Sequence, residues 1–300
     1  MRRLVLVLCA LLCAAPGLAG EVRLAVADAD IAVTIAHDGF AIGSAGVVEW
    51  VRRSADIVGR YYGRFPVRTL TVEVTASGGA AVRQGKAFPA DLPVIRATLG
   101  REVSAAALHD DWVLPHEMIH LALPELADAH LWLAEGLATY VEGVARVQAG
   151  NMTEIALWDE YLHAMPKGMP SAGDRGLDRT HSWGRTYWGG ALFCLVADVT
   201  IRERSSNRAG LQDALRAIAR DSGGMTASWP IERVLATGDA ATGTRVLGEL
   251  YESWRERPTA PDLAALWQRL GVEAASDSIR LRGDTPGAAI RLAIIRPPAR

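Results

Sequence analysis

The chain has 300 residues, which allow one large domain or two small ones with a substantial core. Its 32 Lys and Arg residues nearly balance its 34 Asp and Glu residues, and the formal net charge is −2. Such an interspersed balance argues against binding of nucleic acid or of a charged membrane surface. The function therefore has to be sought in particular residues.

Residues 1–19 are predicted to be a secretory signal peptide. Arg2 and Arg3 form a positive start, 4–15 is a short apolar run, and Gly17-Leu18-Ala19 is a small-residue cleavage site. The alternative, an uncleaved membrane anchor, requires about 20 apolar residues to span a bilayer. We therefore expect an exported bacterial protein, periplasmic or secreted, without a stable membrane span. Only Cys194 remains after cleavage, and we expect it to be a small core residue.

The segment 20–104 is predicted to form an N-terminal subdomain that contains both strands and a helix. The glycine- and alanine-rich stretch 77–84 is expected to be a loop. An amphipathic helix is predicted over 45–62, and strand patterns cover 22–26, 31–35, 70–74 and 92–99.

The stretch His116-Glu117-Met118-Ile119-His120 has the pattern of a zinc-binding helix. On a helix, His116 and His120 are one turn apart on the same face, so both imidazoles can reach one ion, and Glu117 lies beside them. A simpler alternative is a pair of hydrogen-bonded core histidines.

A catalytic zinc ion takes three protein ligands and leaves its fourth position to water. Glu135 is the predicted third ligand, because 131–144 has apolar residues at helical spacing and an antiparallel helix would return it to the histidines. His130 is the alternative ligand, in a connection where geometry is poorly fixed.

These elements carry a family resemblance. HEMIH, followed by Trp132-Leu133-Ala134-Glu135-Gly136-Leu137-Ala138, resembles the gluzincin metallopeptidases, most closely the peptidase MA-like family, and also the catalytic domain of HExxH aminopeptidases. The resemblance implies that one zinc ion binds to His116, His120 and Glu135 and that Glu117 activates a water molecule. The metzincin pattern fails, because it requires Gly and His where this chain has Leu123 and Leu126.

The family also has a Y-x-x-G element whose tyrosine supports an oxyanion, and Tyr187-Trp188-Gly189-Gly190 is similar to it. Tyr187 is therefore a predicted catalytic residue, with His181 as an alternative donor. In similar enzymes a strand ahead of the zinc helix forms the lip of the cleft and pairs with extended substrate, and we assign that role to 92–99. An ordinary covered edge strand is the alternative.

The resemblance implies an α+β fold, a thermolysin-like zincin catalytic domain with a small mixed sheet and a helix before a mainly helical part. We place the helical zinc-binding subdomain at 105–225 and a C-terminal helical segment with a β-hairpin at 226–300. The hairpin strands are predicted at 278–281 and 289–295, on either side of a glycine- and proline-containing turn.

Asp110 and Asp111 precede the motif helix, where they are expected to be helix caps or partners of a metal-bound imidazole. The stretch 166–179 is expected to be a long exposed loop.

The resulting hypothesis is an exported zinc metallopeptidase that acts on peptide or protein substrates. The alternative is a non-catalytic module that binds peptides or proteins on the same scaffold. The chain has no equivalent of the glycine-rich element with which exopeptidases bind a substrate amine, so the sequence leaves endopeptidase and exopeptidase action open.

Overall fold

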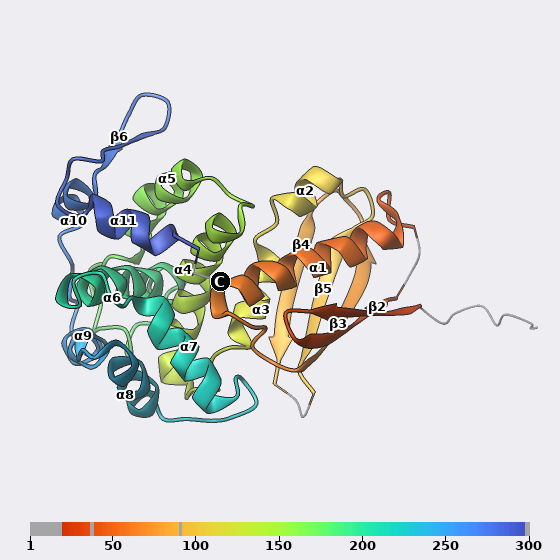
Figure 1. Cartoon of the computed structure of the whole chain (residues 1–300), viewed down its shortest axis with the longest axis horizontal. Coiled ribbons are helices and arrows are strands. Elements are labelled where there is room, and N and C mark those ends of the chain that lie inside the picture. Colours follow the sequence, from red (N-terminus) through yellow and green to blue (C-terminus); the bar gives the residue numbers. More distant parts are fainter. Residues whose placement is uncertain (1–19, 37–38, 90–91, 298–300) are drawn as a thin grey trace, which may run out of the picture.

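The structure is a computed structural model that describes residues 20–36, 39–89 and 92–297. The predicted signal peptide at 1–19 lies outside these residues. Figure 1 shows two lobes, one built on a β-sheet and one of helices, with helix α3 between them. Within the described ranges, no helix is both long enough and apolar enough to span a membrane.

The first lobe is a five-stranded mixed sheet with the strand order β1-β2-β3-β5-β4. The inner pairs β2/β3 and β3/β5 are parallel, whereas the outer pairs β1/β2 and β4/β5 are antiparallel. The strands are β1 (Glu21–Val26), β2 (Ala29–Ile35), β3 (Thr69–Ser77), β4 (Val82–Phe88) and β5 (Val94–Gly100). The mixed sheet with a helix is as predicted.

Helix α1 (Gly43–Tyr62) covers one face of the sheet. Its buried residues recur every three or four positions, as in Val47, Val51, Ala55 and Val58, because one stripe of a helix faces a sheet. Along the strands of the sheet, buried residues alternate with less buried ones. Val72 and Val74 of β3, for example, are fully buried.

Strand β4 corrects two predictions about the cleft. The loop expected at 77–84 is present but shorter, at 78–81, because Ser77 ends β3 and Val82 begins β4, the strand at the sheet's edge. The predicted lip strand, which corresponds to β5, is an inner strand hydrogen-bonded on both sides. The assignment of the lip to 92–99 is therefore wrong, and β4 is the edge strand that contacts α3.

The second lobe is mainly helical, as predicted. The chain reaches it through the short α2 (Ala105–His109), which lies beside α1 on the first lobe, and α3 (Val113–His120), and it ends with α11 (Ala288–Ile295) (Figure 1). Between them lie η1 (Asp128–His130), α4 (Leu131–Ala149), α5 (Glu154–Ala164), η2 (Met165–Gly168), η3 (Arg185–Gly189), α6 (Gly190–Arg204), α7 (Leu211–Ser222), α8 (Ile231–Thr242), α9 (Val246–Trp254) and α10 (Leu263–Leu270).

A C-terminal hairpin is present, but it lies earlier in the chain than predicted. Its strands are β6 (Val272–Ala274) and β7 (Ile279–Leu281), whereas the predicted second strand at 289–295 belongs to helix α11 (Ala288–Ile295). The alternation of Ile290, Leu292 and Ile294 suggested a strand, but Leu292 is 43% exposed. Buried Arg291 donates to the carbonyl of Leu270 and fixes the helical arrangement.

Helices α4 and α6 touch through their backbones. A Cβ atom added at Gly136 of α4 would lie 2.2 Å from the backbone of Gly190, the first residue of α6. Only a residue without a side chain permits this approach. Because Gly136 follows Glu135 in the chain, this close contact fixes the position of α4 and, with it, the position of the Glu135 carboxylate.

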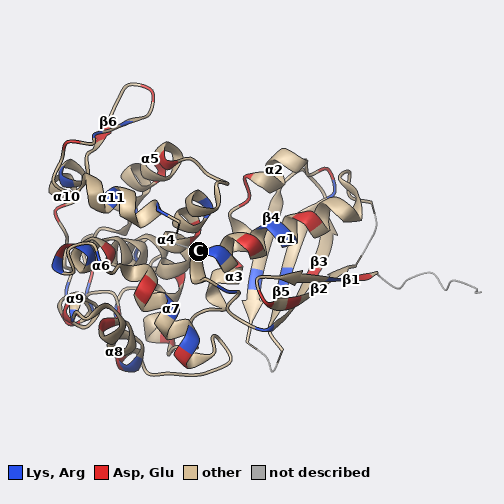
Figure 2. Ribbon diagram, viewed as in Figure 1, with Lys and Arg blue, Asp and Glu red and all other residues tan. Residues whose placement is uncertain are grey.

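Basic and acidic residues are distributed over both lobes (Figure 2). The predicted limits of the subdomains, at 104 and 225, stay predictions, because the core runs continuously through both lobes.

Candidate metal centre

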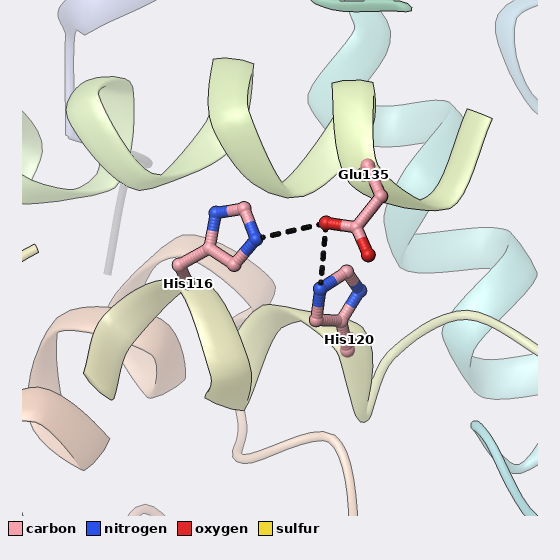
Figure 3. A group of neighbouring side chains, drawn as sticks. All are labelled: His116, His120 and Glu135. Carbon is pink, nitrogen blue, oxygen red and sulfur yellow. Dashed lines mark hydrogen bonds and ion pairs between the residues drawn. The ribbon is translucent and has the colours of Figure 1, made fainter. Parts of the chain in front are cut away.

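Helix α3 presents its two histidines to α4. Both imidazoles point toward Glu135 (Figure 3), with His116 Nε2 at 3.2 Å and His120 Nε2 at 3.5 Å from Glu135 Oε2. One ligand atom from each of the three residues lies within 4.8 Å of the others. The structure thus brings together the three residues predicted as metal ligands.

These distances suit a zinc ion. Two ligands at about 2.0 Å from a tetrahedral ion are about 3.3 Å apart, close to both separations found here. Two imidazole nitrogens and a carboxylate oxygen are also donors that zinc accepts in catalytic sites.

The electrostatics of the three residues are strongly coupled. Burial opposes ionisation of Glu135, but hydrogen bonds from His116 and His120 outweigh it and hold the pKa of this carboxyl well below its usual range. Burial lowers the pKa of His116, whereas for His120 the bond and charge of Glu135 outweigh burial and raise the pKa. The site therefore holds a carboxylate that requires a positive partner.

The Nδ1 atom of His116 is buried and has no hydrogen-bond partner among the described residues. A metal-bound imidazole usually donates its second N–H to a carboxylate, carbonyl or water. Neither aspartate before α3 fills this place. Asp111 instead caps α3 by accepting hydrogen bonds from the backbone N–H groups of Val113 and Leu114 at 3.0 and 3.1 Å.

Glu117 is half-buried beside the histidines, on the side facing β4. Its Oε2 accepts a hydrogen bond of 2.8 Å from the backbone N–H of Ala87. Gly85 makes this approach possible, because a Cβ atom there would lie 2.7 Å from Glu117 Cγ. The sequence did not single out β4, whose polar residues and glycine obscure its strand pattern.

Tyr187 completes the group from a third element. It lies in η3, a π-helical turn at the start of α6, and its ring is nearly parallel to that of His116, at a centroid distance of 6.4 Å. Burial raises the pKa of Tyr187, and the charges of Glu135 and Glu117 raise it further. The phenol thus remains a hydrogen-bond donor at neutral pH.

A cavity of about 670 Å³ joins these groups. Its walls include the backbone of β4, the three predicted ligands, Glu117 and Tyr187, and apolar side chains of the connection after α3. His181, the alternative oxyanion donor, is exposed and is not among the lining residues. No residue of the 166–179 loop lines the cavity either, and Leu177 bonds instead to the Trp254 carbonyl behind α4.

His130, the alternative third ligand, belongs to a different cluster. Its Nδ1 lies 3.1 Å from Asp178 Oδ1, which also accepts a hydrogen bond of 2.7 Å from Trp132 Nε1. The hydroxyl of Tyr251 donates to Asp178 Oδ2 at 2.8 Å. We call these four residues the Asp178 cluster. It ties the start of α4 to the loop and to α9.

Comparisons with known proteins give a consistent fold. An aminopeptidase N family protein from Idiomarina loihiensis matches with a TM-score of 0.65 and 12% identity over 86% of this chain and 51% of its own. A mutant M1 zinc metallopeptidase from Deinococcus radiodurans, bound to a Tyr-Ser-Ala substrate, matches with a TM-score of 0.51 and 18% identity over 82% of this chain and 54% of its own. Over most of its length the chain has a fold similar to that of these two peptidase structures.

The present chain thus spans about half the length of these solved structures. No family model matches it, and the search of curated proteins gives no match. At these identities the likeness establishes the fold, and the chemistry has to be argued from the site.

Proposed function

We propose that the protein is a zinc-dependent peptidase in which His116, His120 and Glu135 hold one zinc ion and Glu117 is the general base. The observation that carries the proposal is the spacing of the three donor atoms, which suits zinc, beside a carboxylate that faces the same cavity. A structural zinc site has no use for such a base.

Bound zinc supplies a water molecule of lowered pKa and polarises the scissile carbonyl. Glu117 takes a proton from the attacking water as the hydroxyl oxygen joins the carbonyl carbon. When the carbon–nitrogen bond breaks, Glu117 returns the proton to the leaving amine. The Tyr187 hydroxyl donates a hydrogen bond to the oxyanion formed between these steps.

The edge of β4 supports binding of a peptide in this cavity. Backbone groups at a sheet edge pair readily with an extended chain, and this edge lies next to Glu117. The substrate is therefore proposed to be a peptide or protein. Export, proposed from residues 1–19, would place that substrate in the periplasm or outside the cell.

Cleavage of a mixed peptide library by the zinc-loaded protein, read by mass spectrometry, tests the proposal. Glu117→Gln keeps the size and hydrogen bonding of the side chain but removes the base, so we expect it to retain zinc and to lose at least about 1,000-fold in turnover. Equal cleavage by parent and variant would remove Glu117 from the mechanism. No cleavage by a folded, zinc-loaded parent would favour the alternative, a non-catalytic peptide-binding module.

A further inference from the structure

Two exposed tryptophans flank the candidate centre. Of the nine tryptophans in the chain, seven are buried, whereas Trp112 is 53% exposed and Trp183 is 62% exposed. A tryptophan buries about 150 to 250 Å² when it packs, so each of these half-exposed indoles leaves a large part of that apolar surface in water. Both of the unburied rings lie at the same place in the molecule.

The two tryptophans occupy equivalent positions on their helical turns. Trp112 is four residues before His116, and Trp183 is four residues before Tyr187. One turn of helix therefore sets each indole over a residue of the candidate centre. Trp112 meets His116 edge to face at 5.7 Å, and Trp183 stacks on Tyr187 at 5.8 Å with 28° between the rings.

These contacts form a continuous row of rings. His116 and Tyr187 are themselves nearly parallel, at 23°, so the order is Trp112, His116, Tyr187, Trp183. We call this set the aromatic row. Trp112 and Tyr187 line the cavity, and Trp183 extends the row beyond its rim.

We infer that the aromatic row is a substrate subsite that binds an aromatic side chain of the peptide next to the scissile bond. The inference rests on the proposed function, because it takes the cavity for the place where a peptide lies. Exposed ring faces that continue an existing stack favour a planar, apolar partner. His116 is both a member of the aromatic row and a candidate ligand of the zinc ion at which the bond is cut. A side chain bound on the row therefore has to belong to a residue next to that bond.

Binding to the non-turnover protein tests the subsite separately from the chemistry. Zinc-loaded Glu117→Gln protein is titrated by calorimetry with peptides that differ only in Phe, Leu, Arg or Ala beside the cleavage position. We expect the Phe peptide to bind at least about 10-fold more tightly than the Ala peptide, and Trp183→Ala and Trp112→Ala each to reduce this preference about 3- to 10-fold.

Ile155→Ala is the matched control, since Ile155 is a large apolar residue, 52% exposed, on α5 and outside the cavity lining. It should leave the preference for Phe unchanged. Zinc content and circular dichroism are measured for each variant. If Trp112→Ala disturbs His116 and lowers the zinc content, the test of the subsite rests on Trp183→Ala alone. Equal binding of the Phe and Ala peptides, tighter binding of the Arg peptide, or an undiminished preference in Trp183→Ala would overturn the inference.

The two proposals fail in different ways. If the parent cleaves peptides without a preference for aromatic residues, the peptidase stands and the subsite is wrong. If the parent cleaves nothing but its Glu117→Gln form binds the Phe peptide through the tryptophans, the subsite stands and the peptidase is wrong.

Discussion

Helix α4 begins between two clusters made of the same kinds of residue. The candidate metal centre has His116, Glu135 and Tyr187, and the Asp178 cluster has His130, Asp178 and Tyr251, each with a tryptophan alongside. In the Asp178 cluster the two carboxylate oxygens face three donors that the protein itself provides. In the metal centre, two imidazole nitrogens face a single carboxylate oxygen.

The comparison teaches that a histidine beside a carboxylate does not by itself indicate a metal site. Buried polar groups normally have their hydrogen bonds satisfied, and the Asp178 cluster achieves this with side chains of the protein itself. Glu135 instead faces two groups that are themselves good zinc ligands. The difference lies in which groups satisfy the carboxylate, and matched substitutions in the two clusters can test it.

The largest effect is expected for Glu135→Ala. Removing one of three protein ligands should weaken zinc binding by at least about 100-fold, because even the partners of ligands contribute 10- to 100-fold. The measurement is a competition titration against a chelator of known affinity. Asp178→Ala is the control, and a comparable loss of zinc affinity in that variant would break the distinction between the clusters.

Tyr187→Phe should lower the turnover number by about 100-fold, the usual cost of losing one oxyanion donor, with little change in KM. Its matched control is Tyr251→Phe, which deletes the corresponding hydroxyl from the Asp178 cluster. Steady-state kinetics on a peptide found in the library screen separates the two. Unchanged turnover in Tyr187→Phe would place Tyr187 outside the mechanism.

Asp178→Ala should reduce the free energy of unfolding by about 2 to 4 kcal/mol, because Trp132, His130 and Tyr251 lose their shared acceptor. Urea denaturation followed by fluorescence gives the value. Zinc content should stay at that of the parent. A variant that is as stable as the parent would show that the cluster contributes no net stability.

Glu142 of α4 is a third carboxylate for the comparison, and its surroundings affect the stability of the fold. It is buried, and its Oε2 lies 3.5 Å from Arg146 Nη1. Burial raises its pKa to about 8, with smaller contributions from the charges of Glu160 and Asp111, although Arg146 opposes the shift. The parent should therefore lose stability as the pH rises from the ordinary carboxyl pKa to about 8, since the unfolded chain ionises first. Glu142→Gln escapes this loss.

The stability difference between Glu142→Gln and the parent should grow in favour of the variant by on the order of 2 kcal/mol between pH 5 and pH 9. Chemical denaturation at pH 5, 7 and 9 provides the measurement. Glu252→Gln, at a residue 66% exposed, should show no such trend. A constant difference across this range for Glu142→Gln would mean that Glu142 is ionised in the fold at neutral pH.

Local spacing made the grouping of the three candidate ligands predictable from the sequence. His116 and His120 lie one turn apart on α3, and the apolar period after 131 predicted the helix that carries Glu135. Tyr187 was found through a resemblance, although its π-helical turn was not. The Asp178 cluster could not be foreseen, because its members come from segments far apart in the chain.

Strand β4 and helix α11 were not predicted from the sequence. In both, the surroundings in the fold weaken the hydrophobic pattern by which a strand or a helix is recognised. Strand β4 pairs on one side only and has Gly85 where α3 approaches, so it lacks the apolar alternation of an inner strand. Helix α11 has apolar residues that also fit an alternating pattern, and Arg291, buried by contacts with distant carbonyls, decided the outcome. Tertiary contacts of this kind leave no local signal.

The contact of Gly136 with Gly190 has a consequence for how natural variation in this protein should be interpreted. Neither glycine has a side chain to offer a metal or a substrate. Yet a single added methyl group would push α4 off α6 and carry Glu135 along with it, so that zinc affinity would drift while every ligand remained in place. A survey that scores variants by the identity of the ligands alone would classify such a chain as intact. Its candidate centre would nevertheless be altered, because a wider spacing of the two helices displaces Glu135 from the histidines.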